Sequence, residues 1–366
     1  MDLQDRLQRL YRQAQRGDLL HFLSGAEAGG DEALFAFADR VRREHVGDAI
    51  HLRAIVEFSS FCRNDCLYCG LRRSNRGLQR LRMPLEEIVA QCRRAATLGF
   101  RTVVLQSGED PFYGREALVD LVRRVKGETG LAVTLAVGER SEEEYRAFFA
   151  AGADRYLLKH ETSDRELYER LDPELSHERR IECLRTLKRI GFQTGSGIMV
   201  GLPGQTLESI ADDILLFRDL DIDMIGCGPF IPHPATPLAG AAPGSEELTY
   251  RVVALARVVT RDTHIPATTA LAVLVGDTGR ANALCRGANV VMPNITPQPW
   301  RRAYEIYPNK GRTEVFDPAL LERLRRAARE LGRFIAEDAG DRVKGPPPFL
   351  DIHGEKSDNS LTGRSS

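Results

Sequence analysis

Short β-rich runs alternate with amphipathic helical patterns along most of this chain, and this alternation restricts the possible folds more than any other feature. From His51 onward the candidate strands are Arg53–Phe58, Thr102–Gln106, Ala132–Val137, Arg155–His160, Thr194–Val200, Met224–Pro229, Ala267–Val273 and Asn289–Met292. Strand alternating with helix predicts a parallel sheet, and eight such units predict an α/β fold, a closed or nearly closed (β/α)8 barrel of the TIM type. A doubly wound open sheet is the alternative, but no glycine-rich dinucleotide fingerprint follows the first strand.

Apolar residues recur at three- and four-residue spacing between these strands and predict the intervening helices. The predicted helices are Pro84–Leu98, Arg115–Thr129, Ser141–Ala150, His177–Ile190, Leu207–Leu220, Glu246–Thr260 and Asp277–Arg286. Ser141 begins the sequence Ser-Glu-Glu-Glu, which is typical of a capping box at the start of a helix.

Two flanking parts are expected outside this alternation. Residues 1–50 carry helical patterns at Leu3–Gln15 and Asp31–Glu44 and predict an N-terminal helical extension. The barrel is assigned to residues 51–340, with a last amphipathic helix at Pro318–Ala336. Residues 341–366 are rich in Gly, Pro, Ser and charge, a composition that cannot repay the entropy of ordering, so a disordered tail is expected.

Charge and hydropathy exclude several classes of partner. The 366 residues include 51 basic and 52 acidic side chains, for a net charge of -1, so no overall field favours nucleic acid or an anionic membrane. The N-terminus lacks the apolar run of a signal peptide, and no stretch approaches the roughly 18 apolar residues that a membrane span requires. We therefore expect a cytoplasmic protein with a small-molecule partner.

Three of the seven cysteines, Cys62, Cys66 and Cys69, follow directly on the first predicted strand. Thiolates at this spacing can bind three irons of a [4Fe–4S] cubane and leave the fourth iron open to an external ligand. A structural zinc site is the alternative, but it would need a fourth, distant protein ligand. The remaining cysteines are dispersed and are expected to be small core side chains: Cys92, Cys183, Cys227 and Cys285.

The sequence Cys-x3-Cys-x-aromatic-Cys resembles the signature of the radical S-adenosylmethionine (SAM) superfamily. The resemblance implies that SAM binds the open iron and is cleaved reductively to methionine and a 5′-deoxyadenosyl radical. It also implies a set of SAM-binding residues, with Glu161 at the ribose, Arg180 at the carboxylate and Met199 on the adenine side. The full set is Tyr68, Gln106, Ser107, Gly108, Glu161, Arg180, Met199 and Tyr304.

Longer stretches between Ile55 and Tyr307 resemble the HydE group of [FeFe]-hydrogenase maturases, among them FCRNDCLYCGLRRSN, AGADRYLLKHET and GANVVMPNITPQPWRRAY. The resemblance implies a role in assembling the diiron subsite of the H-cluster. It also implies a small anionic organometallic or sulfur-containing substrate, with other hydrogenase maturases and a one-electron donor such as ferredoxin or flavodoxin as partners. Donors and cations suited to an anion are expected to line the lumen: Thr134, Arg155, Lys159, Thr268 and Thr269.

Two features depart from the HydE pattern. No cysteine follows Tyr307, so a second cluster is not predicted. Lys159 occupies a position where the group commonly has Arg, and Lys is a point charge rather than a planar fork, so the geometry of anion binding is expected to differ.

Three alternatives remain open at this point. A methylornithine-synthase-like mutase would need a carboxylate for the substrate ammonium, and residues 266–270 offer only hydroxyls. Sulfur insertion of the biotin-synthase kind would need a second cluster. A non-enzymatic iron–sulfur scaffold or carrier would not need Glu161 or Arg180.

Overall fold

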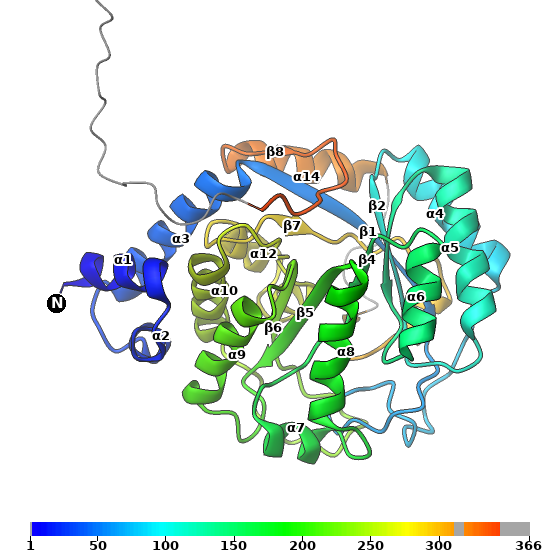
Figure 1. Cartoon of the computed structure of the whole chain (residues 1–366), viewed down its shortest axis with the longest axis horizontal. Helices are drawn as coiled ribbons and strands as arrows, with labels where there is room; N and C mark the ends of the chain where they lie inside the picture. Colours follow the sequence, from blue (N-terminus) through cyan, green and yellow to red (C-terminus); the bar gives the residue numbers. More distant parts are fainter. Residues whose placement is uncertain (1, 311–317, 345–366) are drawn as a thin grey trace, which may run out of the picture.

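A computed structural model describes residues 2–310 and 318–344 as an α/β fold around one curved parallel sheet (Figure 1). The strands are β1 (Ala49–Ser59), β2 (Thr102–Ser107), β3 (Ala132–Ala136), β4 (Arg155–Leu157), β5 (Gln193–Val200), β6 (Met224–Pro229) and β7 (Val290–Val291). They lie in the order β6-β5-β4-β3-β2-β1-β7. Because all of them pair in parallel, their carboxyl ends share one edge of the sheet, and the predicted TIM-type class is confirmed.

Helices follow the strands, and most of the longer ones cover the outer face of the sheet (Figure 1). They are α4 (Leu85–Thr97), α5 (Arg115–Thr129), α6 (Glu142–Ala150), α7 (Arg165–Leu171), α8 (His177–Ile190), α9 (Leu207–Asp219), α10 (Glu246–Thr260), α11 (Thr269–Val275), α12 (Asp277–Leu284), α13 (Trp300–Ala303) and α14 (Pro318–Glu330). The predicted capping box forms at Ser141, whose side chain and Glu144 satisfy each other's backbone N–H. The helices α7 and α13 were not predicted from the sequence, because in a helix of about two turns or fewer the apolar residues do not recur often enough to show a helical spacing.

The predicted strand Ala267–Val273 is wrong, because most of this stretch forms α11. The wall between β6 and β7 is held instead by two single parallel bridges, Met224 with His264 and Pro266 with Val290. Pro266 has no N–H to donate and so cannot extend a ladder of hydrogen bonds. The barrel is nearly closed, and we call these two bridges the β6–β7 seam.

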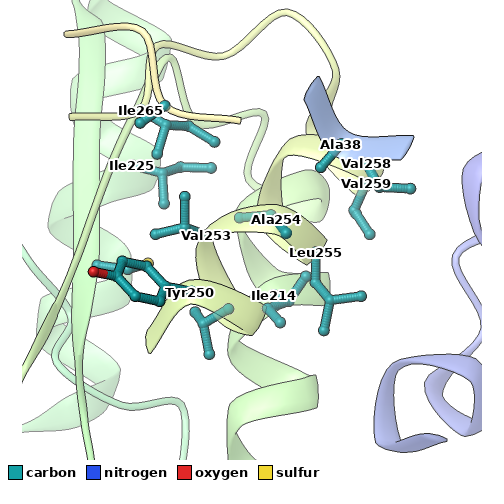
Figure 2. Close-up of a cluster of buried hydrophobic side chains, with 14 of the residues drawn as sticks. Ala38, Ile214, Ile225, Tyr250, Val253, Ala254, Leu255, Val258, Val259 and Ile265 are labelled. Atoms are coloured by element: carbon teal, nitrogen blue, oxygen red, sulfur yellow. The ribbon is translucent and has the colours of Figure 1, made fainter. Parts of the chain in front are cut away.

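The N-terminal extension packs on the barrel through a shared hydrophobic core. Its helices are α1 (Leu3–Gln13), α2 (Arg16–Ser24) and α3 (Gly30–Val46), of which α2 was not predicted. Figure 2 shows Ala38 of α3 close to α10 residues Val258 and Val259, with Ile214 of α9 nearby. Since α10 lies between the sheet and α3, almost every residue along its second half is buried.

The chain after α14 returns to the barrel. The predicted helix Pro318–Ala336 ends at Glu330, and β8 (Phe334–Ile335) pairs in parallel with Ala49 and Ile50 at the start of β1. This pairing brings the C-terminal segment, defined here as residues 338–344, to the amino-terminal end of the barrel.

The C-terminal segment closes that end of the barrel through polar contacts. Arg53 donates to the Gly340 carbonyl at 3.0 Å, and the Thr102 hydroxyl donates to the Ala339 carbonyl at 2.8 Å. Arg342 donates to Asp262 at 2.8 Å. The expected disordered tail is therefore wrong for residues 341–344, while residues 345–366 lie outside the described residues.

Among the described helices, none combines the length and apolar character needed to cross a bilayer.

Candidate active site

Alternate residues of the strands line the inside of the barrel. The register aligns Ile55 with Val104 and Val104 with Thr134, and paired residues project to the same face of a sheet. A small apolar cluster results inside the barrel, formed by Ile55, Val104, Ala136, Leu157 and Met292. It forms the floor of a cavity at the carboxyl ends of the strands, where barrel enzymes carry their active sites.

The cavity has a volume of about 350 Å³. The structure brings together nine of the predicted site residues in its lining: Cys66, Tyr68, Cys69, Gln106, Lys159, Glu161, Met199, Thr268 and Thr269. Much of the remaining wall is apolar or glycine, including Gly226, Gly228, Phe230 and Pro266. An apolar cavity with a few convergent polar groups is typical of a small-molecule site.

The cysteine loop covers one side of this cavity. Cys62, Cys66 and Cys69 are free, partly buried thiols. Burial raises the pKa of all three, in the case of Cys69 to about 12, so metal binding must displace their protons. Within residues 2–310 and 318–344, no group of three His, Cys, Asp or Glu side chains is placed around one metal ion. A cubane takes one thiolate per iron, so its ligands need not converge on a single point.

The loop owes its shape to contacts of its own side chains. Asp65 accepts hydrogen bonds from Arg72 at 2.8 Å and from the Ser74 hydroxyl at 2.8 Å. Arg80 donates to the carbonyls of Ser60 at 2.7 Å and Arg72 at 2.6 Å. These contacts hold the three thiols on one loop before any metal binds.

The turn after β2 lies directly against the cysteine loop. A Cβ atom at Gly108 would stand 2.1 Å from the Phe61 carbonyl oxygen and 3.0 Å from the Cys62 Cβ, so only glycine fits. The Ser107 hydroxyl donates to the Gly108 carbonyl, and the Glu109 N–H donates to the Cys62 sulfur at 3.4 Å. The predicted cofactor residues Ser107 and Gly108 thus lie beside Cys62, outside the cavity lining.

Asp172 is a buried carboxyl beside the loop that sequence reasoning missed. The Tyr68 hydroxyl donates to it at 2.8 Å, and burial raises its pKa to about 6. The Leu67 N–H donates to the Leu171 carbonyl, so the end of α7 is joined to the loop. The available signal was the Asp-x6-Leu-Asp sequence that begins and ends α7, but that helix was not predicted.

Lys159 and Glu161 form an ion pair in the cavity wall. Lys159 Nζ lies 3.0 Å from Glu161 Oε2. Glu161 has a φ of 63°, which is unusual for a residue with a side chain, and its segment bridges to Ile198. Beside them, Gly197 and Gly226 approach so closely that a Cβ at Gly197 would stand 2.1 Å from the Gly226 carbonyl and 2.9 Å from Lys159 Cε.

Three more predicted residues lie away from the cavity lining. Arg180 is buried and donates to Glu139 at 2.7 Å and to the Lys159 carbonyl at 2.5 Å, so it supports the end of β4 from outside. The prediction of Arg155 as a lumen residue near the ligand is wrong: its side chain binds the Ala339 carbonyl and Asp341 at the opposite end of the barrel. Tyr304 is buried next to the cavity residue Lys310, whose Nζ lies 4.8 Å from its ring.

Three buried hydroxyls lack hydrogen-bond partners in the described part of the chain, and two of them, those of Thr268 and Thr134, belong to the barrel strands and the cavity wall. The Thr268 hydroxyl lies in the cavity wall, and the Thr134 hydroxyl lies deeper in the barrel. Buried polar groups are rarely left unpaired, so these hydroxyls fit a polar ligand. Sequence reasoning missed a further charged pair at this cavity, Lys310 with Glu57, and the cavity residue Tyr307.

Comparisons with known proteins agree with this geometry. Residues 56–217 match the model of the radical SAM superfamily. The chain is 48% identical over 333 residues to the [FeFe] hydrogenase maturase subunit HydE of Thermotoga maritima, covering 91% of this chain and 95% of that protein. It is 32% identical over 262 residues to a 3-methylornithine synthase of Methanosarcina acetivorans, covering 71% and 73%. The crystal structure of methylornithine synthase (PylB) superimposes with a TM-score of 0.80 at 28% identity, covering 92% and 97%.

A parallel barrel with three loop thiols at its carboxyl edge, together with the matching family model, places this chain in the radical SAM superfamily of enzymes. Membership implies a [4Fe–4S] cluster and SAM. Within that superfamily the chain belongs to the HydE family, as its identity to HydE along nearly the whole length of both proteins shows.

Proposed function

We propose that this chain is a HydE-type maturase that binds one [4Fe–4S] cluster and SAM and takes part in assembling the diiron subsite of [FeFe]-hydrogenase. The observation that carries the proposal is the 48% identity to HydE over 91% of the chain. The cavity beside the three loop thiols supports it, since it offers space for a cofactor next to the cluster ligands.

Cys62, Cys66 and Cys69 would hold the cluster, and the fourth iron would remain for SAM. When both are bound, the cluster supplies the electron that cleaves SAM to methionine and a 5′-deoxyadenosyl radical. This chain's residues position and shield the cofactor. Gly108 lets the β2 turn approach the loop, Glu161 faces the cavity, and Asp172 fixes Tyr68.

The remaining predicted contacts are assigned to SAM by their places around the cavity. Gln106 and Met199 line it directly, while Ser107 and Tyr304 lie just behind its wall. Arg180 would act on the cofactor only through Lys159 and the end of β4, to whose backbone it donates.

The substrate is proposed to be a small anionic organometallic or sulfur-containing compound. Lys159, Thr268 and Thr269 line the cavity, and the free hydroxyl of Thr268 offers a donor. Thr134 lies below the apolar floor of the cavity, so it would donate only to a ligand group that reaches past that floor. Arg155 is not part of this proposal because its cationic group is bound by the C-terminal segment.

A methylornithine-synthase-like activity is the second candidate, given the 32% identity to that enzyme. An amino-acid substrate carries an ammonium group that would need a carboxylate. The carboxylate in the described cavity lining, Glu161, already lies beside Lys159, and Glu57 behind the wall pairs with the lining residue Lys310. This pairing leaves the described cavity lining without an uncompensated carboxylate for an ammonium group, whereas the Thr268 hydroxyl can still donate to an anion. A pure iron–sulfur carrier would not need the cavity at all.

The working context is proposed as cytoplasmic, with other hydrogenase maturases and a ferredoxin- or flavodoxin-like electron donor as partners.

The proposal is tested in two steps with anaerobically reconstituted protein. Dithionite and SAM should yield 5′-deoxyadenosine, and Cys66→Ala should lose both this product and the cluster absorption near about 400 nm. Cys92→Ala is the matched control, because Cys92 is buried in α4 away from the cavity, and it should keep both.

The second step separates the candidate functions. Addition of the protein to a hydrogenase maturation mixture lacking HydE should restore hydrogenase activity. Formation of methylornithine from lysine, without restored hydrogenase, would identify the mutase instead. Absence of any SAM cleavage would leave the carrier function.

A further inference from the structure

The cysteine loop and its continuation carry a strong local positive charge in a chain whose net charge is only -1. Residues 60–82 contain one acid, Asp65, and six arginines: Arg63, Arg72, Arg73, Arg76, Arg80 and Arg82. Arg72 and Arg80 are used inside the loop, on Asp65 and on backbone carbonyls. The other four are exposed.

Two of the exposed arginines are held by carboxylates that lie beneath them. Arg63 pairs with Glu109 and has a side chain 54% exposed, against 6% for its partner. Arg82 pairs with Asp110 at 2.8 Å, with 35% of its side chain exposed and none of the Asp110 side chain. In these two pairs the positive group faces outward and the negative group inward, whereas Arg73 pairs at 2.9 Å with Glu174, an acid that is itself 60% exposed.

Arg63, Arg73 and Arg82 lie close together, and Arg76 follows Arg73 on the same exposed stretch of chain. Arg73 donates to the Arg63 carbonyl at 3.0 Å, and the acids that hold Arg63 and Arg82 are neighbours in sequence. The Arg82 guanidinium lies 4.6 Å from the centre of the Phe112 ring, and Phe112 is 65% exposed. We call Arg63, Arg73, Arg76, Arg82 and Phe112 the basic face.

The basic face lies on the outside of the loop that carries the three thiols. Arg63 directly follows Cys62, and Gly70 to Arg82 continue from Cys69. A protein that contacts this face would come nearer to the thiols than one bound at the C-terminal segment, at the other end of β1. Rates of electron transfer fall steeply with distance, so the basic face is suited to a redox partner.

We propose that the basic face docks an acidic flavin or iron–sulfur electron-carrier protein, a step that rests on the proposed function. The reduced carrier gives up one electron and is oxidised by one step, and the cluster held by the loop is reduced by the same electron. Positive charge around one exposed aromatic fits a weak, electrostatically steered redox complex.

The test uses full-length, cluster-loaded protein without SAM and labelled flavodoxin as the probe. Binding is measured by fluorescence anisotropy, and cluster reduction by flavodoxin hydroquinone is followed from the bleaching of the cluster absorption. The variant Arg73→Gln/Arg76→Gln should weaken binding and slow reduction about tenfold at low salt. Wild-type binding should weaken steeply as salt rises, and the variant should respond much less.

Two further variants exclude general effects of charge and folding. Arg43→Gln/Arg189→Gln removes two exposed charges from α3 and the last turn of α8, far from the loop, and should bind flavodoxin as wild type does. Arg73→Lys/Arg76→Lys keeps the charge and should restore binding.

Equal weakening in the Arg43/Arg189 variant would overturn the proposal, as would salt-independent binding or unchanged binding in the Arg73/Arg76 variant. Reduction of wild type by dithionite without SAM cleavage would contradict the proposed function alone, because the flavodoxin binding data would still decide the docking surface.

Discussion

Gly108 shows how one missing side chain sets the distance between two loops. Its Cβ would collide with the Phe61 carbonyl, so Gly108→Ala should push the β2 turn away from the cysteine loop. We expect reduced iron content after reconstitution and weaker SAM binding, measured by iron analysis and equilibrium dialysis.

Gly127→Ala is the matched control for this substitution. Gly127 lies within α5, and no atom stands within 4 Å of its added Cβ. The control should bind iron normally and gain roughly 0.5–1 kcal/mol of stability, since alanine is the better helix former. Normal iron content in Gly108→Ala would show that the loops need not touch.

For single residues, the sequence predicted correctly which side chains point into the barrel. It was less successful in predicting at which end of the barrel they lie. The three cysteines and Gly108 were found because a local motif contains them. Arg155 was correctly placed on an inward position of β4, in register with Thr134, but not at the right end of the barrel. The Arg155 side chain is held at the amino-terminal end of the barrel by Ala339 and Asp341. These contacts could not be inferred from strand alternation, which predicts only the face to which a side chain points.

Among the elements, the C-terminal segment has a structural role, although the composition of residues 341–366, into which it runs, predicts disorder. It supplies acceptors for Arg53 and Arg155, whose side chains are almost completely buried. A chain ending at Glu337 should therefore be less stable than one ending at Lys344, by about 3 kcal/mol, because buried cations would lose their partners. Urea unfolding of the two truncated chains measures the contribution of residues 338–344 to stability. Equal midpoints and slopes of the two unfolding curves would contradict this role.

The same end of the barrel should make stability depend on pH. His51 is buried against the ring of His264, and burial lowers its pKa to about 4, despite Asp338 at 3.3 Å. The unfolded chain has the ordinary pKa of about 6.5 and binds more protons between these values, so stability should fall as the pH drops below about 6.5.

The expected loss from His51 alone is about 2 kcal/mol between pH 7 and pH 5. His51→Gln should reduce this dependence when urea unfolding is compared at the two pH values. An identical pH dependence in the variant would assign the effect to other groups.

Prediction of helices succeeded where the helix was long enough for its apolar residues to recur over several turns. The bounds of α5, α8 and α10 agree with the sequence patterns residue for residue. The strand predicted at 267–273 failed because apolar residues such as Ala, Leu and Val suit both a buried strand and a buried helix.

For the whole molecule, strand–helix alternation was sufficient to predict the barrel, because connections between parallel strands need crossover helices. It could not predict how evenly the barrel closes. Closure depends on hydrogen bonds that join residues 264–266 to β6 on one side and to β7 on the other. These partners are distant in sequence, and residues 264–266 have no repeating pattern that would predict the pairing.

The β6–β7 seam has a mechanical consequence for the interior. Elsewhere neighbouring strands share continuous ladders, such as β5 with β6, whereas the seam has one bridge on each side of residues 264–266. Widening the lumen there needs to break the backbone hydrogen bonds of one side only, two to Asp223 and Ile225 or three to Asn289 and Val290, so a bulky guest should be accommodated by displacement of this side. Hydrogen exchange should accordingly be faster for backbone amides of residues 264–291 than for β2 and β5, and a bound guest should slow it mainly at that side.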